Sequence, residues 1–276
     1  MVMAMVSQPL AAWADASGSY YDRSFVLAAN TRCGLFAPAV TSALTSSAWQ
    51  ARGAAVRGGV SEADLAATAA RARDKAASTA CDDPELAMVK GRVSEAFAGW
   101  SQTARMNFPG THADWSANRS GFSSPTWRLA QHAVMGQAPI TFGYEATDDA
   151  ARSLKAVVSF VGAPRPYAAR IVMRDTSRAP LPWLADRGVA ALPPQAARRT
   201  FFAISHGIAE PTLLKPGSKD GQAWVFPAAA ADALSGLDPR EPFMIEFLFR
   251  DDSMAQATLE AGDFAAGRAF IAMGSL

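Results

Sequence analysis

Residues 84–100 read PELAMVKGRVSEAFAGW, and this stretch decides the N-terminal half of the fold. Pro84 directly follows Asp83, an arrangement typical of a helix start, because aspartate caps free backbone N–H groups and proline is tolerated in the first turn. Apolar residues then recur at spacings of three and four, which places them on one face of a helix. They are Leu86, Val89, Val93, Phe97 and Trp100. Such a stripe must be buried, so we expect other helices to pack against it.

Three further helices are predicted upstream. They cover residues 20–32, the stretch from Pro38 to the Gly58-Gly59 break, and the residues that follow Ser61. Gly34 suits a left-handed cap at the end of the first helix, and Pro38 suits the first turn of the second. Ser61 with Asp64 forms a short capping box for the third helix, whose apolar seam is narrow. Residues 17–103 are therefore predicted as a helical half.

The chain has two cysteines, Cys33 and Cys81. Two buried thiols are the usual arrangement in a cytosolic protein. Here each cysteine ends a predicted helix, and neighbouring antiparallel helices bring such ends together. We therefore predict a Cys33–Cys81 disulfide, which restricts the unfolded chain by about 4 kcal/mol in the chain-entropy model.

Beyond residue 126 the apolar period changes toward two, which is typical of β-strands. The clearest strand is 243–249, where phenylalanine and isoleucine alternate with residues of the other face. Six more strands are predicted, over 127–134, 139–145, 154–161, 168–174, 200–205 and 223–226, with short helices over 228–237 and 262–273. A second long loop is expected over 175–198. Residues 127–276 are thus predicted as a mostly antiparallel β-sandwich with a C-terminal helix, which makes the chain an α+β protein.

Residues 104–126 show no sustained period and are predicted to be a packed linker between the halves, with a short helix near 113–119. Aromatic and basic residues gather around it. Trp115, Arg119, Trp127 and Arg128 are the candidate binding residues, with Phe122 beside them, because Trp and Arg are frequent at recognition sites. The alternative is that these rings pack one half against the other, and we expect the rings of this stretch to be mostly buried at that junction.

Composition excludes several classes. Lys and Arg number 26 against 25 Asp and Glu, so the chain lacks the basic field that nucleic-acid binding requires. No apolar run reaches the length of a membrane-spanning helix.

Residues 1–16 are apolar and contain small-x-small patterns of the kind that signal peptidase reads, so they are interpreted as a signal-peptide remnant or a flexible arm. We therefore expect an exported protein, periplasmic or otherwise.

The residues that carry chemistry form no recognised motif. His112, His132 and His206 lack metal-ligand spacing, and His132 is expected to be a hydrogen-bonded strand histidine. Ser205 and His206 are adjacent on a strand and point to opposite faces, so they cannot act as nucleophile and base. Phosphate loops and dinucleotide fingerprints are absent, and no cofactor is predicted.

Acidic residues leave one enzymatic alternative, a cell-envelope hydrolase. Glu145, Asp148 and Asp149 cluster after a strand, although solvated turn acids also explain them. Glu246 interrupts an apolar strand. It would need a partner such as an arginine if it were buried, but we expect it to face solvent as ordinary polar alternation.

The C-terminal stretch 224–273 resembles the invasion-associated locus B type of small exported bacterial proteins. The likeness rests on a strand (AWVFP), a short helix (AADALSGLD), a strong strand (PFMIEFLF) and a helix that begins GDFAAGRAF. Asp263 stands between Gly262 and Phe264, which departs from the Gly-Phe-x-x-Ala form, and the β half lacks paired cysteines. The resemblance implies export and a β-sandwich, and no catalytic residues.

Together these observations predict a non-enzymatic envelope or periplasmic protein that binds a partner, such as an envelope protein or a glycan, or forms part of an assembly. The hydrolase and a cytosolic structural protein are the alternatives.

Overall fold

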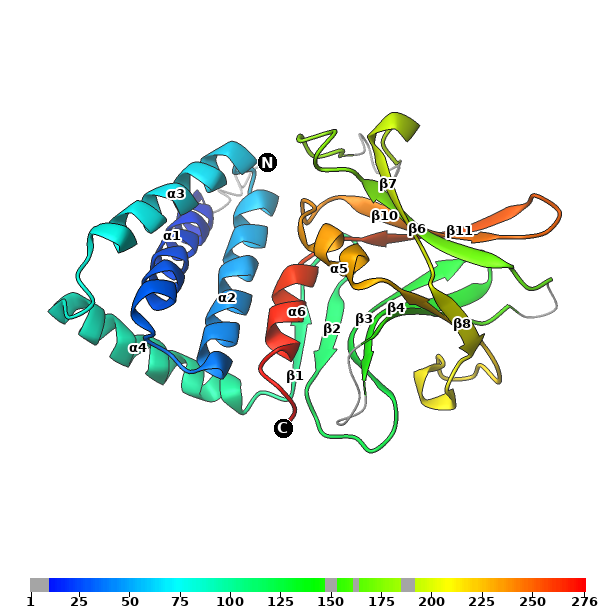
Figure 1. Ribbon diagram of the computed structural model, residues 1–276, viewed down its shortest axis with the longest axis horizontal. Helices are drawn as coiled ribbons and strands as arrows, with labels where there is room; N and C mark the ends of the chain where they lie inside the picture. The colour runs from blue at the N-terminus through cyan, green and yellow to red at the C-terminus, as the bar shows by residue number, and fades with distance from the viewer. Residues whose placement is uncertain (1–9, 147–152, 161–163, 185–191) are drawn as a thin grey trace, which may run out of the picture. The chain divides into compact units, whose positions relative to one another are not determined.

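The computed structural model of this chain describes residues 10–146, 153–160, 164–184 and 192–276. They form helices first, then two antiparallel sheets, then a closing helix, which confirms the α+β prediction (Figure 1). The chain divides into two compact units, residues 1–101 and 102–276. In the described part, no helix is both long enough and apolar enough to cross a bilayer.

The first unit consists of α1 (Leu10–Cys33), α2 (Pro38–Arg57), α3 (Glu62–Ser78) and α4 (Pro84–Ser101). The predicted helix caps are present. Gly34 adopts a left-handed φ of +62° after α1, and the Ser61 hydroxyl accepts a hydrogen bond from the Asp64 N–H at 3.1 Å before α3. Pro38 stands in the first turn of α2. Residues 10–16, predicted to belong to a remnant or arm, form the start of α1, whereas residues 1–9 lie outside the described part. Helix α1 packs along both α2 and α3.

The predicted disulfide is present. Cys33 and Cys81 are bonded, with their Cα atoms 5.5 Å apart, and they join the end of α1 to the turn before α4. Arg32 reinforces this corner, because its guanidinium donates to the carbonyls of Ala77 and Thr79.

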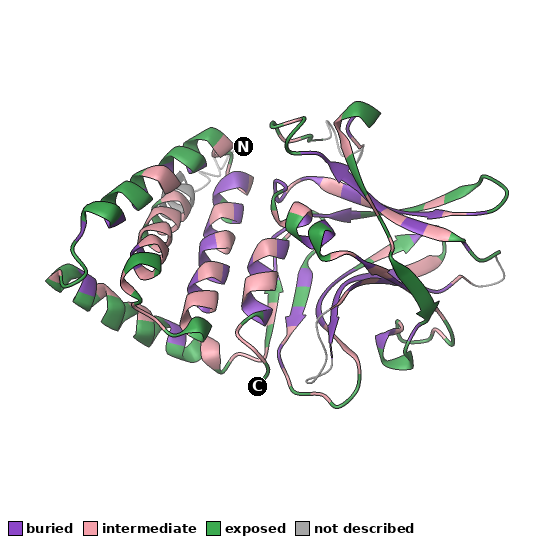
Figure 2. Ribbon diagram, in the orientation of Figure 1, coloured by how far each residue is buried: buried purple, intermediate pink, exposed green. Residues whose placement is uncertain are grey.

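Helix α4 buries less of its stripe than the sequence predicts. Leu86 and Phe97 are buried, whereas Val89, Val93 and Trp100 are only half-buried. Figure 2 shows most of the α4 surface exposed. The prediction of a fully buried stripe is therefore wrong at Val89, Val93 and Trp100, and beside Val89 and Val93 the neighbouring helices leave a cavity.

The second unit contains two antiparallel sheets. The seven-stranded sheet has the order β1-β2-β3-β4-β5-β9-β8, and the four-stranded sheet the order β11-β10-β6-β7. The strands are β1 (Arg105–Phe108), β2 (Trp115–Asn118), β3 (Thr126–Met135), β4 (Ala138–Ala146), β5 (Ser153–Val158), β6 (Ala168–Arg174), β7 (Arg198–Phe202), β8 (Ser205–Ile208), β9 (Gln222–Phe226), β10 (Pro242–Leu248) and β11 (Met254–Glu260).

The sheets pack face to face through large aromatic side chains, which confirms the sandwich. Phe142 of β4 lies 5.4 Å from Phe243 of β10, and Trp224 of β9 lies 6.0 Å from Phe247 of β10, between ring centroids. Two helices complete the unit, α5 (Ala228–Ser235) and α6 (Phe264–Ile271), with short 3-10 turns η2 (Gln195–Ala197) and η3 (Pro211–Leu213). Helix α6 packs on β1, β2 and β3.

Residues 104–126 contribute β1 and β2 to the large sheet. The helix predicted near 113–119 is wrong, because alternate residues of β2 face the core and the strand pairs with β1 and β3. The rings expected at a junction have their partners inside this unit: Phe108 contacts Phe270, and Trp115 contacts Phe264 at 4.8 Å. These core contacts explain why the stretch carries so much apolar surface.

Glu246 corrects a second expectation. It is 2% exposed on β10, and its carboxylate accepts from Arg170 at 2.6 Å and from Gln256 at 3.0 Å. The expectation of a solvent-facing glutamate is wrong. The neighbouring strands β6 and β11 supply the partners, because Arg170 and Gln256 stand opposite Glu246 in the two registers.

Candidate functional site

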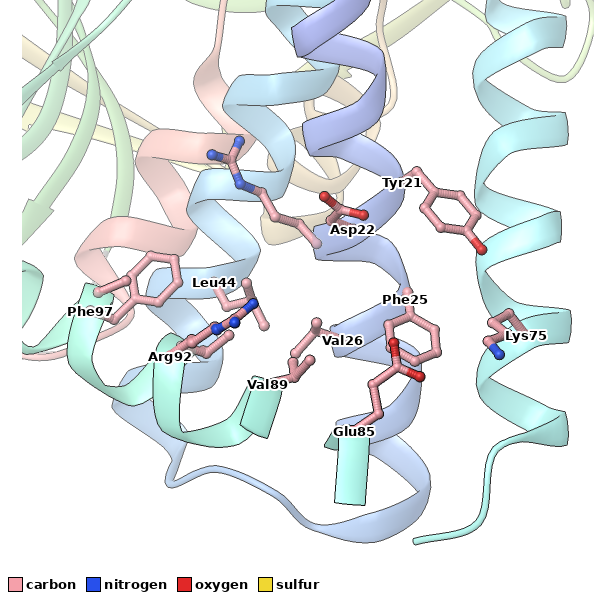
Figure 3. A pocket seen from close by; sticks show the side chains of 13 residues that line it. Tyr21, Asp22, Phe25, Val26, Leu44, Lys75, Glu85, Val89, Arg92 and Phe97 are labelled. Atoms are coloured by element: carbon pink, nitrogen blue, oxygen red, sulfur yellow. The ribbon is translucent and has the colours of Figure 1, made fainter. Parts of the chain in front are cut away.

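The four helices of the first unit line an open cavity of about 520 Å³. Its apolar wall combines side chains of α1, α2 and α4, namely Phe25, Val26, Leu44, Val89, Val93 and Phe97. Figure 3 shows Val26 and Val89 turned toward one another, with Leu44 and Phe97 on one side. Because Phe25, Val89 and Val93 remain half-buried, the wall is accessible from outside. Pockets of this size and lining are typical small-molecule sites.

Charged side chains surround the apolar wall. Asp22 and Glu85 contribute negative charge, and Lys75 and Arg92 contribute positive charge; all four are exposed. None of these four side chains forms an ion pair with another residue in the described part of the chain. Their ionic groups therefore face solvent at the entrance, where they can meet a polar end of a bound molecule.

The cavity has a local structural cause. Helix α1 packs along α3 and along α2, whereas α4 packs mainly on α2. The disulfide and buried Leu86 hold the beginning of α4, and buried Phe97 holds its later part. Between these two anchors Val89 and Val93 are only half-buried, and they line the cavity.

A second cavity, of about 500 Å³, lies in the β unit beside Glu260. The Glu260 carboxylate is already occupied: it accepts the backbone N–H groups of Thr111 and His112 at 2.7 Å each and of Ala113 at 3.2 Å. Glu260 therefore fixes the loop between β1 and β2. The sequence analysis did not single out this residue, since no local pattern links position 260 to 111–113.

The four candidate binding residues do not come together in a surface groove. Trp115 is fully buried, and its indole N–H donates to the carbonyls of Glu260 and Ala261. Arg119 is buried and donates to Gly274 at 2.8 Å and to Thr103 at 3.1 Å.

The other two candidates also hold the framework. Half-buried Trp127 donates its indole N–H to the Leu213 carbonyl at 3.0 Å. Buried Arg128 donates to the Ser120 carbonyl and lies over the ring of Phe122. These contacts agree with the structural interpretation of the cluster.

Those residues considered for catalysis that the structure describes have structural partners. Buried Glu145 pairs with Lys155 at 2.7 Å, while Asp148 and Asp149 lie outside the described residues. His132 is hydrogen-bonded to Thr141 on β4, as expected, and His206 stacks on Trp224. Among the described residues, no group of three or more His, Cys, Asp or Glu side chains is arranged to hold a metal ion.

Comparison of the chain with protein-family models, with curated proteins and with solved structures gave no match. The resemblance of residues 224–273 to the invasion-associated locus B type stays a prediction. In this stretch the structure adds β11, which the sequence analysis missed, between the strong strand and the final helix.

Proposed function

We propose that this protein is an exported binding protein, and that the cavity among α1, α2, α3 and α4 is its binding site. The observation that carries the proposal is the apolar wall left open beside Val89 and Val93. Leaving such surface accessible costs free energy relative to closing the helices over it. A ligand that fills the cavity recovers that free energy.

The ligand class follows from the lining. Six apolar side chains favour an aliphatic or aromatic body, while the exposed acids and bases at the entrance favour a polar end that stays in water. The site thus fits an amphipathic small molecule. Export is proposed on the disulfide, because such bonds form and persist in oxidising compartments.

The test uses the neutral fluorescent probe N-phenyl-1-naphthylamine with the full, oxidised chain. Val89→Trp places a large ring in the cavity, so we expect it to weaken probe binding at least ten-fold. Met88→Trp is the matched control, because Met88 is the preceding residue of α4 and is 52% exposed. It should bind the probe as the wild type does.

Two outcomes would contradict the proposal. The first is a wild-type chain that does not bind the probe. The second is equal binding by the two tryptophan variants, which would show that the probe sits elsewhere. Circular dichroism at 222 nm checks that both variants keep their helices.

A further inference from the structure

The loop that follows β6 exposes a compact set of apolar side chains. Leu181 is 80% exposed, Trp183 41% and Leu184 42%. Single exposed apolar residues are ordinary on protein surfaces, but here three stand within four successive positions, and one of them, Leu184, also lines the cavity beside Glu260. In this article the patch of Leu181, Trp183 and Leu184 is called the apolar tip.

The main chain beneath the apolar tip is firmly held. Arg174 and Glu241 form a buried ion pair, with Nε to Oε1 at 2.5 Å and Nη2 to Oε2 at 2.7 Å. Arg174 also donates to the carbonyls of Ala179 and Pro180, and Glu241 accepts the Trp183 N–H at 2.8 Å. The backbone on both sides of Leu181 is thus anchored to the sandwich.

The sequence adds stiffness to these anchors. Pro180 and Pro182 restrict φ on either side of Leu181. At the start of the loop, Asp175 closes a turn by accepting from the Ser177 N–H and hydroxyl at 3.0 and 2.6 Å. Because residues 175–183 are already held by these bonds, displaying the tip to a partner costs little further conformational entropy.

Arginines stand at the base of the same loop. The side chain of Arg178 is 66% exposed, and its Nε lies 3.5 Å from Oδ2 of Asp175. The pKa of Asp175 is held below its ordinary value, mainly by the Ser177 hydrogen bond and in addition by the charges of Arg178 and Arg199. Arg199 is exposed on β7 and lies over the ring of Phe201. Two exposed arginines thus act on Asp175, at the start of the loop that carries the apolar tip, and their two positive charges exceed its single negative charge.

We propose that the apolar tip is a membrane-docking element that inserts into the surface of an anionic lipid bilayer. Leucine side chains enter the boundary of the acyl region, and tryptophan prefers the headgroup level. Arg178 and Arg199 would then face anionic headgroups, which attract each arginine by about 1 kcal/mol. The charge complementarity favours a lipid surface over an apolar protein groove, and the proposal does not depend on the cavity of the helical unit.

The experiment measures co-sedimentation of the full oxidised chain with vesicles of phosphatidylcholine alone, or of phosphatidylcholine with one quarter phosphatidylglycerol. We expect binding to the anionic vesicles that weakens as salt rises. Leu181→Asp combined with Leu184→Asp should reduce partitioning at least ten-fold. Arg178→Gln and Arg199→Gln should each reduce it about five-fold, which corresponds to the attraction per arginine.

Ile208→Asp is the matched control, because Ile208 is 87% exposed on β8 and lies outside the loop. It should bind vesicles like the wild type. An environment-sensitive dye on Leu181→Cys should shift to the blue with anionic vesicles, and the same dye on Ile208→Cys should not.

Two results would overturn the proposal: a wild-type chain that ignores anionic vesicles, or a double aspartate variant that binds them unchanged. The first would leave the tip as a candidate protein-docking site. Near-ultraviolet circular dichroism verifies folding, which the high exposure of Leu181 should leave intact.

Discussion

Replacing both cysteines, as Cys33→Ser with Cys81→Ser, is expected to lower the free energy of unfolding by about 4 kcal/mol. The bond spans 48 residues of sequence, and closing a loop of that length restricts the unfolded chain by this amount in the chain-entropy model. Helix α4 depends on the bond more than α2 and α3 do, because only Leu86 and Phe97 of α4 are buried, whereas α2 has nine buried residues and α3 four. Each such side chain contributes roughly 1.5–3 kcal/mol by burial, so the disulfide and the packing of α4 are comparable in size.

Two measurements report the effect of removing the disulfide. Urea unfolding at 222 nm gives the free energy, and hydrogen exchange resolved by mass spectrometry gives the opening of α4. A change of 4 kcal/mol corresponds to about 10³-fold in an equilibrium constant. The amides of residues 84–101 should therefore exchange faster in the variant than in the wild type, by at most about 10³-fold. Wild-type protein treated with a reductant should behave like the double variant, and the double variant itself should not respond to the reductant.

The reasoning fails if unfolding changes by less than about 1 kcal/mol, or if the α4 amides exchange as slowly in the variant as in the wild type. Either result would mean that packing alone holds α4, and that the cavity beside it does not depend on the covalent bond.

Three further changes test other parts of the structure. Gly143→Ala should lower the free energy of unfolding by at least about 2 kcal/mol in a denaturant melt, because a Cβ at this position would stand 1.8 Å from a carbonyl oxygen of β3. Gly207→Ala is the control: a Cβ there would meet nothing within 4 Å, so the free energy of unfolding should change by no more than about 0.5 kcal/mol. Removing the hydroxyl at Ser177 by alanine should raise the pKa of Asp175 toward its ordinary value. A lowered carboxyl pKa stabilises the fold above about pH 4, and this stabilisation is lost on further acidification. The Ser177→Ala variant should therefore lose less stability than the wild type as the pH falls below about 4. Carboxyl NMR titration follows the pKa of Asp175, and acid unfolding follows the stability. Phe97→Ala should cost about 3 kcal/mol in urea, and a cost below about 1 kcal/mol would show that this ring is not a core residue.

The helical half could be predicted in some detail because its signals are local. Caps at Ser61 and Gly34, the proline at position 84 and the spacing of the α4 stripe all lie within a few residues of the elements they define. The strands with a clear period of two, such as Phe243 to Leu248, were also found for this reason. Strands β1, β2, β8 and β11 were missed, since strands without a clear apolar period form only because a neighbouring strand pairs with them.

The candidate site was out of reach of the same reasoning. The apolar stripe of α4 predicts that Val89 and Val93 need a partner, but it cannot tell whether other helices close over them. That depends on where α1 and α2 stand relative to α4, and the structure leaves a cavity there. The apolar tip presents the same limit, because one of its anchors, Glu241, is distant in sequence.

By itself, the sequence determined the α+β order of elements, the helix ends marked by caps and the pair of cysteines, because hydrophobic period, capping and chain connectivity act over short distances. It placed the start of α1 at residue 20, whereas the helix begins at Leu10. Only the tertiary structure decided which polar residues are buried. Glu246 faces Arg170 across a strand pair, Glu260 holds the loop of residues 111–113, and Arg174 meets Glu241. Each pairing joins residues at least 67 positions apart. The free energy of a buried charge depends on a partner that folding alone brings within a few ångströms.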